Sequence, residues 1–189
     1  MAQLESSITT DRLTLRRFAP GDLRALSVLY GDESVTRYLY FGTRDHVQTQ
    51  LALEKKLAQP VGITDDNVLP VAAVLTSNGR LVGDFMLRWT ANEHRQGEIG
   101  GSLAPEFHGM GYAPEIYREL LSLGFNTFGL HRIVGRCDGR NAASIRSLEK
   151  AGLHREAHFL ENEFVKGEWT DEVVLALRRS EWLIGQTAR

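Results

Sequence analysis

Residues 97–114, GEIGGSLAPEFHGMGYAP, decide the fold of this chain. The first part predicts a strand over residues 96–103, and the second places Gly109 and Gly111 immediately before an amphipathic helix with Ile116 on its apolar face. A helix start presents backbone N–H groups that have no partner in the helix, at the positive end of the helix dipole. Because glycines let an anion approach such a backbone closely, this turn predicts a phosphate site.

Two well-known phosphate-binding turns do not fit this stretch. A nucleotide P-loop requires a Lys-Ser or Lys-Thr pair after its glycines, and none follows Gly111. Residues 108–113, HGMGYA, do not complete the GxGxxG pattern of dinucleotide-binding folds. The remaining alternatives are a different kind of phosphate loop and a plain tight connection between a strand and a helix.

The composition is that of an ordinary globular protein. A length of 189 residues suits one domain, which we expect to span residues 1–189 with a core over about 8–182. The chain has 42% hydrophobic and 24% charged residues and a formal net charge of -2. It therefore lacks the basic excess of a nucleic-acid binder, and nucleic acid is not an expected partner.

Cysteine, histidine and the N-terminus restrict the chemistry and the location. Cys137 is the only cysteine, which excludes an internal disulfide, and the six histidines show no paired ligand spacing, so no metal is expected. The first ten residues, MAQLESSITT, show neither a basic nor an apolar segment, and no later stretch approaches ~20 apolar residues. We expect a cytoplasmic protein that does not bind membranes.

Periodicity and turn residues predict the remaining elements. Strands are expected over residues 13–18, on both sides of Ser77-Asn78-Gly79, over residues 131–137, and on both sides of Lys166-Gly167. Helices are expected from Pro20 to Gly31, from an N-cap at Thr43 to Pro60 with Val47 and Leu51 on the apolar face, from the glycine turn to Gly129, and from Asn141 to Gly152. This order predicts a mixed sheet with helices on both faces.

At this point the chain resembles the GNAT N-acetyltransferases, whose phosphate loop reads Gln/Arg-x-x-Gly-x-Gly/Ala. His108, Gly111 and Ala113 occupy those positions. The resemblance covers nearly the whole chain and is greatest to the Rim-type branch, the ribosomal-protein N-terminal alanine and serine acetyltransferases. It also rests on TDRLTLR at 10–16, EIG at 98–100, NAASIRSLEKAG at 141–152, GEWTD at 167–171 and EW at 181–182. The resemblance implies an α/β fold with a mixed sheet of about seven strands, splayed between strands 4 and 5 and flanked by about four helices.

The resemblance also implies a reaction, the transfer of an acetyl group from acetyl-CoA to a primary amine by direct attack on the thioester. The loop from His108 through Gly109, Met110, Gly111 and Tyr112 to Ala113 would hold the CoA diphosphate through backbone N–H groups. The strand ending at Leu103 would lie along the pantetheine, and one of its N–H groups would stabilise the oxyanion. Asn141 would contact the pantetheine, unless it serves only as a helix N-cap.

Two side chains are candidates for proton transfer. Glu98 lies close to the position where some relatives carry a general base, although it would equally serve as a strand residue that pairs with a neighbour. Glu161 and Glu163 are alternative bases. Many relatives use a tyrosine as general acid where this chain has Leu148, so Ser144 is the candidate acid, its alternative role being an ordinary first-turn residue.

The acceptor amine is the open question. At pH 7, neutralising an α-amine of pKa ~8 costs about 1 kcal/mol, and neutralising a lysine-like amine of pKa ~10.4 costs about 5 kcal/mol. This favours a protein or peptide N-terminus. A small-molecule amine, such as an aminoglycoside-like antibiotic, is the first alternative. A non-catalytic acetyl-CoA sensor is the second. The protein is expected to be a monomer or a homodimer.

Overall fold

The fold, seen in a computed structural model that describes residues 7–59 and 67–187, is built around a mixed sheet with strand order β1-β2-β3-β4-β5-β6-β8-β7. Its strands are β1 (Ile8–Thr9), β2 (Leu13–Arg16), β3 (Val68–Leu75), β4 (Leu81–Ala91), β5 (Gln96–Leu103), β6 (Arg132–Asp138), β7 (His154–Val165) and β8 (Glu168–Arg178). The α-helices of this part of the chain are α1 (Leu23–Gly31), α2 (Glu33–Thr36), α3 (His46–Leu57), α4 (Tyr112–Ser122), α5 (Ala142–Ala151) and α6 (Arg179–Thr187). The expected mixed α/β fold is confirmed.

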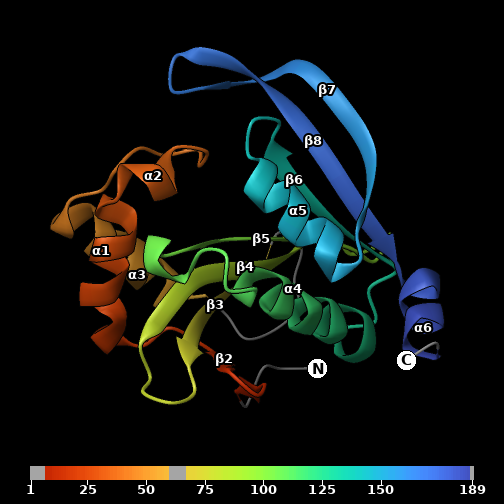
Figure 1. Ribbon diagram of the computed structural model, residues 1–189, viewed down its shortest axis with the longest axis horizontal. Helices are drawn as coiled ribbons and strands as arrows, with labels where there is room; N and C mark the ends of the chain where they lie inside the picture. Colours follow the sequence, from red (N-terminus) through yellow and green to blue (C-terminus); the bar gives the residue numbers. More distant parts are fainter. Residues whose placement is uncertain (1–6, 60–66, 188–189) are drawn as a thin grey trace.

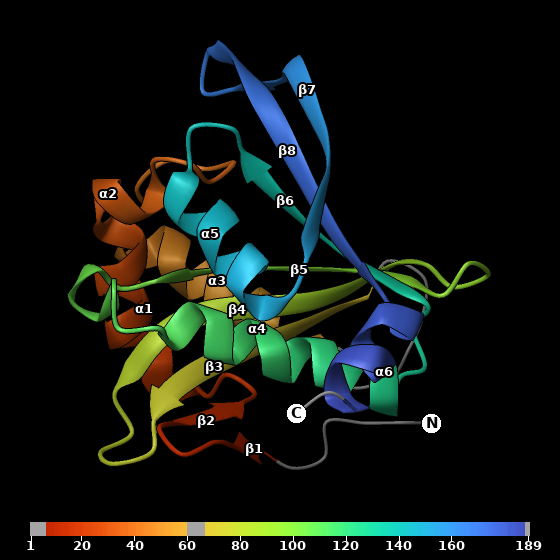
Figure 2. The same cartoon turned by 45° about the vertical axis from the view of Figure 1, so that its right-hand side comes forward.

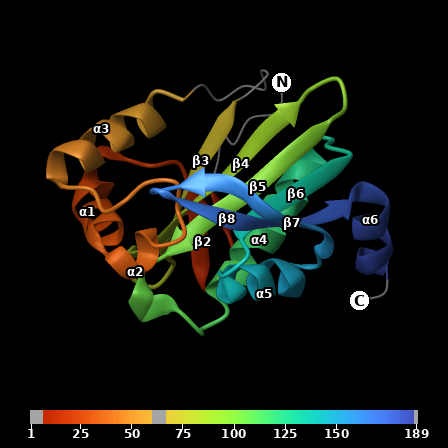
Figure 3. The same ribbon diagram turned by 90° about the horizontal axis from the view of Figure 1, so that it is seen from above.

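The two faces of β4 show how the layers are arranged. Phe85 makes an edge contact with Tyr117 of α4 at a ring-centroid distance of 5.5 Å. On the other face, Asp84 accepts hydrogen bonds from Tyr30 of α1 and Lys56 of α3. Because neighbouring strand residues point to opposite faces, the sheet separates α1 and α3 from α4, as Figure 3 shows.

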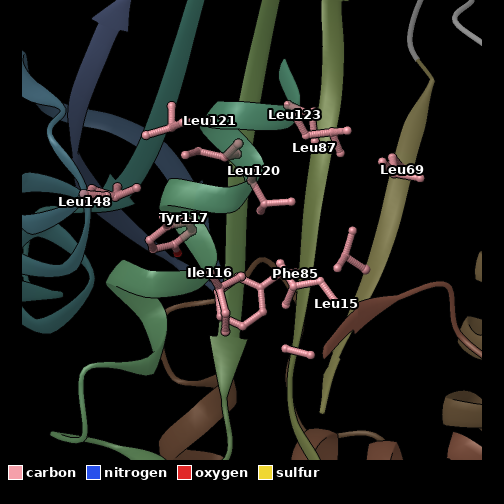
Figure 4. Packing of buried hydrophobic residues seen from close by; sticks show 14 of the residues in the cluster. Leu15, Leu69, Phe85, Leu87, Ile116, Tyr117, Leu120, Leu121, Leu123 and Leu148 are labelled. Carbon is pink, nitrogen blue, oxygen red and sulfur yellow. The ribbon is translucent and has the colours of Figure 1, made fainter. Parts of the chain in front are cut away.

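One part of the core lies between α4 and the strands, and another part lies under α1 and α3. Ile116, Leu120 and Leu121 of α4 are fully buried, and Figure 4 shows Ile116 beside Phe85 of β4 and Leu121 on the side of the helix toward Leu148. These positions repeat at the spacing of one helix face. The predicted apolar face of this helix is therefore confirmed, and its packing fixes where the glycine turn before it lies.

The parallel strands β5 and β6 pair over a short distance and then separate. Their register joins Gln96 to Arg132, Gly97 to Ile133 and Glu98 to Val134. Beyond Glu98, β5 stays paired with β4 as far as Leu103, and β6 stays paired with β8. Figures 1 and 2 show β6 rising away from β5 toward the long β7–β8 hairpin. Without β1, which was not predicted, β5 and β6 are the fourth and fifth strands, so the splay expected between strands 4 and 5 is confirmed. Glu98 lies at the base of this splay.

The helix predicted from Thr43 is partly wrong. The helix α3 begins at His46 and is capped by Asp45, whose carboxylate accepts the N–H of Gln48 in a capping box. Val47 and Leu51 are exposed, whereas Thr49 and Leu53 face the core. The capping box fixed the start, and the packed face carries Leu53 together with Ala52 and Leu57. The predicted stop at Pro60 lies outside the described residues.

The other elements follow their turn signals. Gly79 has a φ of 72° in the turn between β3 and β4, and Gly152 ends α5 with a φ of 112°. The short helix α2 was not predicted, and the sheet has one more short strand, β1, than expected. Within residues 7–59 and 67–187, none of the helices is long and apolar enough to cross a membrane.

Candidate active site

Two joined cavities lie where β5 and β6 separate. The larger, about 550 Å³, is bounded by the end of β5, the glycine turn and the first turns of α4 and α5. The smaller, about 180 Å³, lies between β5, β6 and the β7–β8 hairpin. The residues that line both are Tyr38, Leu39, Gly101, Tyr117, Asn141 and Ser144. Ligands held in the two cavities would therefore meet beside Gly101 and Ser144.

The two cavities carry opposite charge. Among the described residues, the larger is lined by Arg146 and Lys150 and by no carboxylate. The charged residues that line the smaller are Glu98, Asp138, Glu163, Asp171 and Glu172, with Arg136. Opposite charges attract most strongly where water is partly excluded. The larger cavity therefore suits an anion and the smaller a cation.

The glycine turn leaves backbone N–H groups free at the start of α4. Gly109 and Gly111 have φ values of 75° and 79°, which glycine adopts readily. Gly111 is the N-cap and has no side chain to accept a hydrogen bond from the first turn. The N–H groups of Tyr112 and Ala113 are thus left for an acceptor from outside the helix, and both residues line the larger cavity.

The rest of the predicted loop divides between the cavity and the surface. His108 lines the larger cavity, as Leu103 does, and its Nε2 lies 3.1 Å from the Leu103 carbonyl oxygen. Met110 is 52% exposed and does not line either cavity. Its carbonyl oxygen accepts a hydrogen bond of 2.9 Å from Arg12. The side chain of Met110 therefore has no place in the cavity, and only its peptide group belongs to the turn.

Gly101 stands on β5 at a position where the resemblance to the GNAT family implies an aromatic residue. A Cβ atom at Gly101 would lie 2.3 Å from the Phe85 ring, which comes from the neighbouring strand β4. Phe85 lines the larger cavity and is almost fully buried. The aromatic wall is thus present, but it comes from β4 and covers the glycine.

The first turn of α5 forms the wall between the cavities. The side-chain oxygen of Asn141 accepts the backbone N–H of Ser144 at 3.1 Å, so the predicted N-cap is confirmed. The Ser144 hydroxyl is not used in this cap, and it lies 3.2 Å from the Cys137 sulfur. Leu148, in the position of the family's tyrosine, packs over Gly135 of β6, where a Cβ atom would lie 2.6 Å from it.

A buried phenol lies on the other side of Ser144. Tyr117 of α4 lines both cavities together with Ser144. Burial, with Cys137 nearby, raises the pKa of Tyr117 well above its usual value. Burial also raises the pKa of the Cys137 thiol to about 11. Both neighbours of Ser144 therefore carry their proton at neutral pH.

Glu98 is held at the base of the splay through one oxygen. Its Oε2 accepts a hydrogen bond of 2.6 Å from Arg88 and lies 3.8 Å from Nε of Arg136. Among the described residues, no hydrogen bond or ion pair reaches Oε1. Glu98 is buried and lines the smaller cavity. It is thus oriented by one oxygen while the other is available.

Two further carboxylates line the smaller cavity. Glu172 is 3% exposed and accepts hydrogen bonds from Arg136 and from Asn162. Glu163 lines the same cavity as Tyr40, and its negative charge, together with desolvation, raises the pKa of Tyr40. Glu161 lies in an irregular part of β7 with a φ of 46° and lines neither cavity. Of the two alternative bases, the structure places Glu163 and not Glu161 beside Glu98.

Sequence reasoning missed several residues of this site. Tyr117 lies one residue after Ile116 in a strongly apolar helix, so the pattern indicated only a core residue. Tyr38 and Tyr40 follow the unpredicted helix α2, and Phe85 lies on another strand. The aromatic character of these residues was the one signal in the sequence that could have pointed to them as part of the site. Within the described residues, no cluster of three histidine, cysteine or carboxylate side chains is arranged to hold a metal.

Comparisons with known proteins agree with this geometry. The family described as "Acetyltransferase (GNAT) domain" matches residues 12–154. The uncharacterized N-acetyltransferase YnaD of Bacillus subtilis is 30% identical and covers 93% of this chain and 98% of its own. The spermidine N(1)-acetyltransferase of Vibrio cholerae is 25% identical and covers 91% and 96%. The crystal structure of an acetyltransferase (GNAT family) from Bacillus anthracis is 28% identical, with a TM-score of 0.82 and coverage of 93% and 99%.

Proposed function

The chain belongs to the GNAT acetyltransferase family and is an N-acetyltransferase that uses acetyl-CoA, and we propose that its acceptor is the α-amine of a protein or peptide N-terminus. The observation that carries the proposal is the charge contrast between the joined cavities. An anionic acyl donor suits the cavity with Arg146 and Lys150, and a cationic amine suits the cavity lined by carboxylates. The two would meet beside Ser144.

On the donor side, the free N–H groups of Tyr112 and Ala113 would bind the diphosphate of acetyl-CoA. Charge-assisted hydrogen bonds from backbone N–H groups to an anion are stronger than neutral ones. The end of β5, near Gly101 and Leu103, would run beside the pantetheine, because it lines the same cavity. A backbone N–H of this strand would stabilise the oxyanion that forms when the amine attacks.

On the acceptor side, Glu98 would take the proton of the ammonium group. Its Oε2 is held by Arg88, and its Oε1 is free to accept a hydrogen bond from the amine. Transfer of the proton to Oε1 leaves a neutral nitrogen with a lone pair, which attacks the thioester carbon. Glu163 and Glu172 would hold positive charge nearby, and Glu172 is the weaker candidate for the base because both of its oxygens already accept hydrogen bonds.

Ser144 would donate a hydrogen bond to the leaving thiolate. A serine hydroxyl has one proton to donate and two lone pairs that accept. Tyr117 and Cys137 both remain protonated at neutral pH, and the Cys137 thiol, 3.2 Å from the Ser144 oxygen, is able to donate to it. Such a donor would leave the single proton of Ser144 for the cavity. Ser144 would replace the tyrosine that the chain lacks at Leu148.

The terminal amine is favoured by the way in which Arg88 holds Glu98. A carboxylate tied to Arg88 gives moderate assistance, and an α-amine needs the least, because its neutralisation costs about 1 kcal/mol at pH 7. The Rim-type sequence resemblance points to the same acceptor. A small polyamine is the second candidate, since five carboxylates exceed what one ammonium group requires and the V. cholerae relative is named a spermidine acetyltransferase.

The test is release of free CoA thiol from acetyl-CoA with a panel of N-terminal peptides and small polyamines. We expect release with peptides, and exclusive release with polyamines would contradict the terminal-amine proposal. Glu98→Gln should lower kcat about 100-fold, the usual contribution of a general base, and leave CoA affinity within about 2-fold. Glu106→Gln is the matched control, since Glu106 is exposed and paired with Arg80.

The pH profile of the Glu98→Gln enzyme separates the acceptors further. Without the base, the rate follows the neutral fraction of the free amine. It should rise about 10-fold per pH unit and level off near pH 8 for an α-amine, but continue toward about pH 10 for an amine as basic as lysine. A pH-independent kcat/KM in this variant would remove the role assigned to Glu98.

A further inference from the structure

Arg12 joins the opening strand of the fold to the glycine turn. Its Nη1 donates to the Met110 carbonyl oxygen at 2.9 Å, and its Nε donates to Glu115 at 2.8 Å. A second hydrogen bond to Glu115 comes from Nη2. The guanidinium also lies over the Tyr112 ring, 4.6 Å from its centroid. The Arg12 side chain thus contacts Met110 before the helix, and Tyr112 and Glu115 in its first turn.

The contact with Met110 sets the direction of the next N–H group. A trans peptide is planar, and its carbonyl oxygen and its N–H point in opposite directions. Because Arg12 holds the Met110 oxygen, the N–H of Gly111 is turned away from Arg12. Gly111 lines the larger cavity, while Arg12 does not. The hydrogen bond therefore aims a donor into the cavity where the proposed diphosphate would lie.

The contact with Glu115 has an electrostatic consequence. Glu115 lies in the first turn of α4, where a carboxylate stabilises the helix but repels an anion that approaches the same N–H groups. Two hydrogen bonds from Arg12 neutralise this charge, and Thr10 donates a third at 2.6 Å. Glu115 is thus kept on the side of the helix that faces the opening strand.

From these contacts we infer that Arg12 is a positioning residue for the diphosphate of acetyl-CoA, acting through the Met110–Gly111 peptide and through Glu115. The inference rests on the proposed assignment of the glycine turn to that diphosphate. Arg12 does not line either cavity, so its effect passes through the loop. It should strengthen binding of donors that contain a diphosphate and leave the thioester end unaffected.

The experiment compares two acyl donors, acetyl-CoA and S-acetylpantetheine, which has the same thioester and no diphosphate. In Arg12→Met, the KM for acetyl-CoA should rise about 10-fold, the loss expected for one charge-assisted hydrogen bond, with kcat within 2-fold. The kcat/KM with S-acetylpantetheine should change less than about 2-fold. The KM of Arg12→Lys for acetyl-CoA should lie between those of wild type and Arg12→Met, because lysine keeps the charge but not the planar guanidinium group with its several donors. Calorimetric titration with CoA gives the same contrast without turnover.

Arg132→Met is the matched control. Arg132 also makes two hydrogen bonds to one glutamate, Glu156, and lines neither cavity. Arg132→Met should leave the ratio of kcat/KM for acetyl-CoA to kcat/KM for S-acetylpantetheine at its wild-type value. Removing the repulsion in Arg12→Met/Glu115→Gln should recover part of the affinity for acetyl-CoA.

Two results would overturn the inference. The first would leave the assignment of the glycine turn to the diphosphate intact, and the second would remove that assignment as well. If wild type prefers acetyl-CoA but Arg12→Met weakens both donors equally, Arg12 only supports the fold, and the loop assignment stands. If wild type does not distinguish acetyl-CoA from S-acetylpantetheine, the loop does not bind the diphosphate, and the assignment fails with it.

Discussion

The two helices that border the larger cavity begin in opposite ways. The first turn of α4 is uncapped, because its N-cap is Gly111. The first turn of α5 is closed by Asn141, whose side chain accepts the Ser144 N–H. Both starts line the same cavity, and each has the positive end of a helix dipole.

The difference separates binding from chemistry. An uncapped start keeps its N–H groups available and therefore suits an anionic ligand. A start capped by a side chain has less to offer an anion, but its first turn is held rigidly. Ser144 sits in that turn with its hydroxyl outside the cap. The α4 start is thus suited to hold the donor, and the α5 start is suited to place a hydroxyl at the reacting atoms.

The largest expected effect comes from breaking the uncapped start. Gly111→Val forces a β-branched residue into a φ of 79°, which distorts the turn and its free N–H groups. Several charge-assisted hydrogen bonds at about 1.5–3 kcal/mol each depend on that geometry. We expect CoA affinity to fall more than about 100-fold, measured by calorimetric titration.

The control for strain alone is Gly79→Val. Gly79 has a similar φ of 72° in the β3–β4 turn, and no atom lies within 4 Å of its added Cβ. This variant should lose comparable stability but bind CoA as wild type does. If Gly111→Val also binds CoA normally, the uncapped start is not the anion site.

The next effect concerns the hydroxyl beside the capped start. Ser144→Ala keeps the cap, because Asn141 bonds the backbone N–H and not the side chain. The kcat should fall about 10- to 100-fold, since a hydrogen bond to a charged group contributes about 1.5–3 kcal/mol. CoA affinity should stay within about 2-fold. Ser144→Thr should recover part of the rate. Equal losses in both variants would indicate a packing role for Ser144.

The sequence predicted the two helix starts because each is specified locally. Glycines before α4, and Asn141 before α5, act on backbone groups only a few residues away. The predicted apolar face of α3 was wrong, because the packed face depends on which side of the helix meets the sheet. Val47 and Leu51 lie on the other side and are exposed. The strands succeeded where Asn-Gly and Lys-Gly turns bounded them.

The missed site residues depend on contacts between distant segments. Phe85 covers Gly101 only because β4 and β5 pair in one register, and Arg12 reaches Met110 across 98 positions of the sequence. Tyr117 has the spacing of a core residue, and only the packing of α4 beside α5 brings it into the cavity wall with Ser144. Local patterns do not carry such information.

A smaller effect would divide the two roles of Asn141. Asn141→Ala removes the cap and should lower the free energy of unfolding by about 1 kcal/mol, measured by denaturant titration. Asn141→Asp retains an accepting oxygen and should restore that stability. It also replaces the Nδ2 donor with an oxygen, so a raised KM for acetyl-CoA in this variant would indicate a contact with the pantetheine. A wild-type KM in Asn141→Asp would leave Asn141 with the cap alone.

The smallest effect tests whether Tyr117 acts through Ser144. Tyr117→Phe removes the phenol hydroxyl, and kcat should fall about 3- to 10-fold if that hydroxyl donates to Ser144, because a neutral hydrogen bond contributes about 1 kcal/mol. In the Ser144→Ala background, the same change should cost nothing further, since the hydroxyl that Tyr117 orients is gone. Additive losses would mean that Tyr117 donates to the leaving thiolate itself. Since burial raises the pKa of Tyr117, its proton stays in place, and the coupling should be unchanged from pH 7 to pH 9. The capped helix start would then supply one hydroxyl, and the uncapped helix would contribute the residue that directs it.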